Sequence, residues 1–109
     1  MNQAIEKAAL QFTADIKDTD TYKEYRKSLD NIKQNAELYE KTNEYRLKSY
    51  ELQIGEPTAD LLERIDQLEE DYQAVIDDQV ACDFLHAELS FCRMMQEISN
   101  YITARLDFE

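Results

Sequence analysis

The sequence contains very little glycine or proline, with one residue of each among 109. Sheets need frequent tight turns, and turns draw heavily on these two residue types. This scarcity excludes a turn-rich sheet protein and predicts long helices with few interruptions. Apolar runs are only a few residues long, so we expect no transmembrane helix. The N-terminus also lacks the basic start and apolar stretch of a signal peptide. We therefore expect an all-helical cytoplasmic protein.

The charge balance is strongly acidic, with 24 Asp and Glu residues against 12 Lys and Arg and a net charge of −12. Nucleic-acid binding depends mainly on basic side chains that neutralise phosphates, so we expect no direct binding to DNA or RNA. The seven tyrosines could stack on bases. Because no basic groove accompanies them, they are better interpreted as core and interface side chains.

The residues that could carry chemistry are few. Cys82 and Cys92 are ten residues apart on one expected helix, about 15 Å along its axis, which is too far for a disulfide. The single histidine, His86, shares a helical patch with Cys82 and Asp83, but a zinc site would need a fourth ligand from another helix. We find no catalytic constellation and expect no cofactor and no enzyme activity. The alternative is a small metal-binding protein or enzyme that uses Cys82, Asp83, His86 and Glu88.

Apolar spacing predicts five helical segments in a single all-helical domain over residues 1–109. Gly55 and Pro57 mark the firmest boundary, because Gly suits the left-handed position after a helix and Pro cannot continue one. Residues 23–48 carry +2 and residues 60–78 carry −7, which favours antiparallel pairing across this boundary. We predict a bundle of about five helices built around a long antiparallel hairpin. The segments are expected at about 3–17, 22–32, 36–54, 60–78 and 79–106.

Two apolar seams alternate steps of three and four residues, the spacing of a coiled coil. A chain this short buries both seams incompletely by itself, so we expect a dimer or higher oligomer. Glu88 falls on the second seam, where it either pairs with a cation or amide or lies at the rim and reaches water; both interpretations stay open. The candidate interaction residues are Leu61, Ile65, Leu68 and Tyr72 on the first seam, and Phe84, Glu88, Phe91 and Met95 on the second.

Three stretches of the sequence carry recognisable helical patterns. Residues 19–25 read Thr-Asp-Thr-Tyr-Lys-Glu-Tyr, Tyr45 is followed by Arg46, and residues 80–88 read Val-Ala-Cys-Asp-Phe-Leu-His-Ala-Glu. They resemble, in turn, the S-x-x-Y-x-x-Y opening, the aromatic-Arg element and the V-x-x-Y/F-L-x-A-E segment of the YlbF/YmcA family of small bacterial proteins. The likeness covers the chain from about Ala4 to Phe108.

The resemblance implies a helical bundle around a long hairpin that self-associates. It also implies a non-enzymatic partner in a complex that influences RNA maturation through a membrane-anchored ribonuclease in Gram-positive bacteria. Through that complex, family members affect competence, sporulation and biofilm formation. Some members carry a cysteine-bearing C-terminal tail associated with iron–sulfur clusters; this sequence is similar to a shorter member without it. We therefore expect protein partners, including family paralogues, and no cluster.

Overall fold

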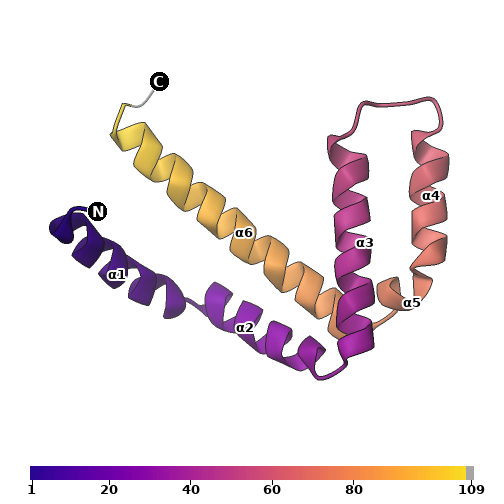
Figure 1. Ribbon diagram of the computed structural model, residues 1–109, viewed down its shortest axis with the longest axis horizontal. Helices are drawn as coiled ribbons and strands as arrows, with labels where there is room; N and C mark the ends of the chain where they lie inside the picture. The colour runs from indigo at the N-terminus through magenta and orange to yellow at the C-terminus, as the bar shows by residue number, and fades with distance from the viewer. Residues whose placement is uncertain (108–109) are drawn as a thin grey trace. The chain divides into compact units, whose positions relative to one another are not determined.

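The structure is a computed structural model that describes residues 1–107; Phe108, where the family resemblance ends, lies outside the described residues. These residues form six helices and contain no strand (Figure 1). The all-helical prediction is therefore confirmed. No helix among residues 1–107 is long and apolar enough to cross a membrane. The helices are α1 (Gln3–Lys17), α2 (Asp20–Lys33), α3 (Ala36–Ile54), α4 (Leu61–Asp71), α5 (Gln73–Ile76) and α6 (Gln79–Arg105).

Side-chain caps set most of the helix starts. The Asn2 side chain accepts hydrogen bonds from two backbone amides at the start of α1, and the Asn35 side chain accepts one from the Leu38 amide in α3. Asp78 accepts from the Ala81 amide at 2.9 Å at the start of α6. These are positions that Asn, Asp, Ser and Thr favour because their side chains satisfy amides without a helical partner.

The expected fourth helix is interrupted, which corrects the count from five to six. Helix α4 ends at Asp71 and the one-turn helix α5 begins at Gln73, because Tyr72 leaves helical geometry at φ −114° and ψ 27°. The interruption falls where the Tyr72 ring is held by α3: it lies 5.7 Å from the Tyr45 ring. A contact made with another helix thus overrides the local helical pattern.

Helix α3 ends at the predicted boundary but with different backbone geometry. Gly55 has φ −70° and ψ 163°, an extended conformation rather than the left-handed one that its glycine suggested. The Gly55 amide still donates to the Glu51 carbonyl at 3.1 Å. Helix α3 therefore ends because the backbone becomes extended at Gly55, two residues before Pro57. The freedom of glycine to take positive φ is not used.

The chain divides into two compact units. Unit 2 comprises residues 28–86 and contains α3, α4 and α5, with the end of α2 and the start of α6. In it α3 contacts α4 and α5, running in the opposite direction to α4 across the connection at residues 55–60 (Figure 1). Its core is made of side chains that are almost wholly buried, namely Ser28, Leu29, Ile32, Thr42, Leu68, Val75, Ala81 and Phe84.

Unit 1 comprises residues 1–27 and 87–109, and so contains α1, the first part of α2 and most of α6. Helix α1 buries none of its 15 residues. In the described part of this unit only Ala87 is fully buried. Unit 1 is therefore a set of amphipathic helices whose apolar sides are largely in contact with solvent.

Candidate protein interaction surfaces

The first seam lies along the contact between α4 and α3 in unit 2. Leu68 is buried, and Leu61, Ile65 and Tyr72 are half-buried. Leu61, Ile65 and Leu68 together line an open cleft of about 430 Å³ between the two helices. This seam therefore contributes partly to the fold of unit 2 and partly to an accessible surface.

A polar cluster on α3 holds Tyr72 at the end of the first seam. The Tyr72 hydroxyl donates to Glu44 Oε2 at 3.2 Å, and Lys48 Nζ lies 5.2 Å from the centre of the ring. A hydrogen bond with Tyr72 raises the pKa of the Lys48 ammonium above its ordinary value of 10.5. Since Lys48 is fully exposed, water screens this interaction and its contribution to stability is small.

The second seam lies along α6 and changes character from one end to the other. Phe84, in unit 2, is buried and meets the Tyr39 ring edge-on at 5.9 Å. Phe91, in unit 1, is half-buried and stacks on the Tyr25 ring with centroids 5.1 Å apart. Glu88 is half-buried and Met95 is 38% exposed. The spacing is regular, yet only the first residue of this seam belongs to a closed core.

Beyond Phe91 the apolar side of α6 lies near α1. Phe12 of α1 and three α6 side chains, Ile98, Tyr101 and Ile102, line an open cleft of about 410 Å³ whose one charged lining residue is Glu97. Phe12 is 42% exposed, Tyr101 59% and Ile102 46%. We call these four apolar residues the α1–α6 apolar surface. Contiguous exposed apolar areas mark interaction sites when they are large, and this surface is the candidate for such a site in unit 1.

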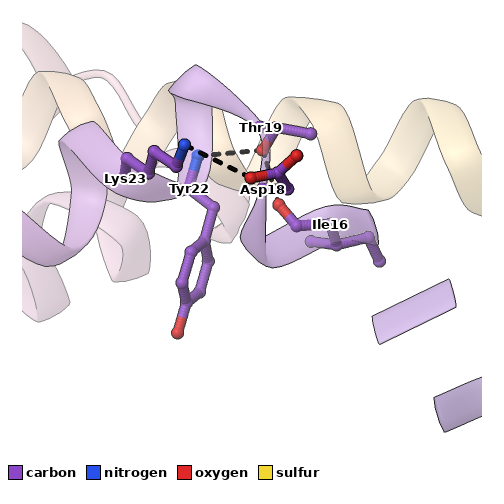
Figure 2. A network of polar contacts seen from close by, with 5 residues as sticks. All are labelled: Ile16, Asp18, Thr19, Tyr22 and Lys23. Atoms are coloured by element: carbon purple, nitrogen blue, oxygen red, sulfur yellow. Dashed lines mark hydrogen bonds and ion pairs between the residues drawn. The ribbon is translucent and has the colours of Figure 1, made fainter. Parts of the chain in front are cut away.

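The turn between α1 and α2 explains part of the sequence pattern at residues 19–25 (Figure 2). The Thr19 hydroxyl accepts from the Tyr22 amide at 3.2 Å and donates to the Ile16 carbonyl at 2.6 Å, so that it joins the end of α1 to the start of α2. An ion pair of 3.4 Å between Lys23 and Asp18 spans the same turn. Thr19 therefore acts as the N-cap of α2.

The two tyrosines of the same pattern have a packing role. The Tyr22 ring centroid lies 5.7 Å from that of Phe91, with the planes tilted by 59°. The Tyr25 ring stacks on the same Phe91 ring. Phe91 thus lies against two rings one helical turn apart on α2, and these three rings join α2 to α6 within unit 1.

The residues of the alternative, metal-binding hypothesis do not gather into a centre. Among residues 1–107, no group of three or more His, Cys, Asp and Glu side chains could hold a metal ion. Cys82 is exposed and its thiol donates to the Ile76 carbonyl at 3.1 Å. Asp83 accepts a hydrogen bond from Gln79, and His86 is exposed. In residues 1–107 the structure therefore does not bring Cys82, Asp83 and His86 together with a further ligand as a metal centre.

The two units differ sharply in charge. Unit 1 has nine acidic and seven basic residues, a net charge of −2. Unit 2 has fifteen acidic and five basic residues, a net charge of −10. The acidity of the chain is thus concentrated in the unit with the buried core, and the unit with exposed apolar side chains is close to neutral.

The sequence analysis did not identify α1 as a contributor to an exposed apolar surface. The stripe of Ile5, Ala8, Phe12 and Ile16 has the spacing of an amphipathic helix, but neither Ile5 nor Phe12 was among the candidate interaction residues. Ile5 is 60% exposed. Residues 1–27 have no net charge, with five acidic and five basic residues, whereas the rest of the chain is strongly acidic. This difference in charge is the signal that could have identified Ile5 and Phe12.

Comparisons with known proteins agree with the sequence patterns. Residues 5–107 match the family described as Control of competence regulator ComK, YlbF/YmcA. No curated protein and no solved structure matches the chain significantly. The family match covers nearly the whole chain and confirms the resemblance. The chain therefore belongs to the YlbF/YmcA family, whose description is the control of the competence regulator ComK.

Proposed function

We propose that this protein is a non-enzymatic regulatory adaptor that acts in the cytoplasm through contacts with other proteins. The family description supports a regulatory role. By the same resemblance, the regulated process is ribonuclease-dependent RNA maturation, with effects on competence, sporulation and biofilm formation. The proposed partners are further copies of the chain, family paralogues and the other proteins of the complex that influences RNA maturation.

The observation that carries the proposal is the α1–α6 apolar surface. Phe12, Ile98, Tyr101 and Ile102 line one open apolar cleft, in a unit whose net charge is only −2. Two copies of such a surface can approach each other with little charge repulsion, whereas two copies of unit 2 would each bring −10. Self-association through unit 1 would cover the exposed apolar side of α1, with coiled-coil packing between helices. The proposed fold remains a helical bundle that includes the α3–α4 hairpin.

The first experiment is light scattering on the full chain, without an affinity tag, at tens of micromolar. We expect a dimer or larger. Ile102→Lys should lower the measured mass towards that of the 12.9 kDa monomer, because it places a charge in the apolar surface. Asn100→Lys adds the same charge about 200° around α6 and should leave the mass unchanged. A monomer mass for the unmodified chain would contradict self-association.

A second experiment tests the regulatory role separately from the oligomer. The full chain is used to capture proteins from its native host, and the captured fraction is examined for family paralogues and for a ribonuclease. We expect both, and we expect untagged protein to contain no stoichiometric iron or zinc. Capture of neither would contradict the adaptor role, and a stoichiometric metal would revive the hypothesis based on Cys82 and His86.

A further inference from the structure

The hairpin of α3 and α4 has two open clefts, and Leu52 and Leu68 are lining residues of both. The first cleft has a volume of about 330 Å³, and its lining includes Lys48 and Arg64 as well as Glu51 and Asp71. Its charges balance within the cleft itself. It therefore offers no preference for a partner of either sign.

The second cleft, which we call the hairpin groove, is different. It is lined by the apolar side chains of Leu52, Leu61, Ile65 and Leu68, and its one charged lining residue is Glu69. No Lys or Arg lines it. Its volume of about 430 Å³ falls within the roughly 300–1,000 Å³ of ligand-binding clefts.

The helix that borders the hairpin groove is strongly acidic. Helix α4 carries five acidic residues and one arginine among its 11 residues. At about 100° per residue, Asp66 follows Glu69 around α4, away from α3. In angle around α4, Leu62 lies between them, and it is 76% exposed. The groove is thus an apolar strip with a carboxylate border along its α4 side.

We propose that the hairpin groove binds a basic amphipathic helix of a partner protein. Apolar side chains at steps of three and four would enter between α3 and α4, and Lys or Arg beside them would face Glu69 and Asp66. This inference gives a partner chemistry to one surface of the proposed adaptor and rests on that function. It concerns unit 2, whereas the proposed self-association uses unit 1.

Charge decides between this occupant and the others. A nucleic acid or an anionic membrane would meet a unit of net charge −10 and would be repelled. A second copy would bring the same acidity. The most basic part of this chain, residues 23–33, has four basic and two acidic residues, but its apolar Leu29 and Ile32 are already buried. A basic helix from another protein is the partner that the groove and its border fit together.

The test uses the full chain and a fluorescent synthetic helix of about 18 residues, long enough for several turns, with Leu at amphipathic spacing and Lys on the flanks. A matched peptide carries Glu in place of every Lys. We expect the Lys peptide to bind with at least tenfold higher affinity than the Glu peptide, measured by anisotropy. Equal binding of the two peptides, or no binding of the Lys peptide, would overturn the proposal.

Two variants separate the groove from general attraction to an acidic protein. Glu69→Lys and Glu63→Lys change the net charge equally, but Glu63 lies about 120° further around α4 than Glu69. We expect Glu69→Lys to weaken binding of the Lys peptide about tenfold and Glu63→Lys to weaken it less than threefold. Equal effects of the two variants would overturn the groove as the site.

The same samples distinguish this inference from the proposed function. Ser49, which also lines the groove, is replaced by Trp to fill it, and the oligomer mass is measured alongside peptide binding. We expect Ser49→Trp to lose the Lys peptide and keep both its mass and its helicity. A bound fraction of Lys peptide that falls as the concentration of the chain rises would identify a second copy as the occupant and overturn the proposal. The unmodified chain could instead prove to be a monomer that binds the Lys peptide, while Ser49→Trp does not bind it. That result would contradict the proposed self-association and leave the groove proposal standing.

Discussion

Units 1 and 2 are built from the same kind of amphipathic helix but differ in where the apolar side chains lie. Unit 2 holds six of the seven fully buried apolar residues of the described chain, and unit 1 holds only Ala87. Unit 1 instead exposes Ile5, Leu10, Phe12, Tyr101 and Ile102 by 42 to 66%. Burial and charge therefore vary together: the closed unit is acidic and the open unit is near neutral. A protein that folds with one part and assembles with another would show this division.

The largest expected difference is between two phenylalanines on α6. Phe84→Ala should lower the free energy of unfolding by about 3–5 kcal/mol, because it leaves a cavity in the core of unit 2. Phe91→Ala removes the same atoms from a half-buried site against two tyrosine rings and should cost about 1–2 kcal/mol. Urea unfolding followed by circular dichroism checks both. Equal losses would break the distinction between the units.

A second pair places one new carboxylate in each unit. Ile65→Asp should lower the free energy of unfolding by about 2 kcal/mol or more, because Ile65 is half-buried beside Leu68 and a buried charge without a partner is unfavourable. Ile5→Asp, at a side chain 60% exposed, should change the free energy of unfolding by about 0.5 kcal/mol or less at low protein concentration. Thermal melts of both variants measure this. A larger effect at Ile5 would show that α1 is part of the fold and not of the assembly.

Local signals in the sequence predicted much of the fold. The bounds of α1 and α3 follow from apolar spacing and from the break at Gly55 and Pro57, which act within one or two turns of chain. The interruption at Tyr72 could not be predicted in the same way, because its cause is contact with α3. A helical pattern gives the direction of a side chain and not the group that it meets.

The candidate site was predicted less well, for the same physical reason. Phe84 and Met95 have equivalent places on one seam, yet the first is 1% exposed and the second 38%. Spacing cannot say where along a helix the neighbouring core ends. That residues 1–109 act as a single domain stays a prediction, and both interpretations of Glu88 stay open.

A smaller effect sharpens the description of unit 1. Thr19→Ala should lower the free energy of unfolding by about 1 kcal/mol, because the first turn of α2 loses the hydroxyl that accepts from the Tyr22 amide. Thr21→Ala is the matched control, since it removes the same atoms one residue before Tyr22 and leaves the cap in place. Thermal unfolding of both variants gives the comparison. If Thr21→Ala were the more destabilising, the pattern at residues 19–25 would owe its threonines to something other than capping.

The smallest expected effect concerns the connection that leads into α4 of unit 2. The Thr58 hydroxyl donates to Asp60 Oδ1, and this hydrogen bond lowers the pKa of the Asp60 carboxyl below its ordinary value of 3.8. A carboxyl whose pKa is lowered by folding stabilises the fold above its unfolded pKa, and this contribution is lost as the pH falls through the folded value.

Thr58→Ala should therefore raise the pKa of Asp60 and make the stability of the protein less dependent on pH below about 4. Thr58→Ser keeps the hydroxyl and should keep the lowered pKa. Carbon NMR titration of the Asp60 carboxyl in the three proteins measures the shift directly. Because Asp60 is fully exposed, water screens the interaction, and melting temperatures at neutral pH should not distinguish the variants. A pKa of Asp60 that is the same in Thr58→Ala and in the unmodified chain would show that the connection at residues 55–60 is not held by this hydrogen bond in solution.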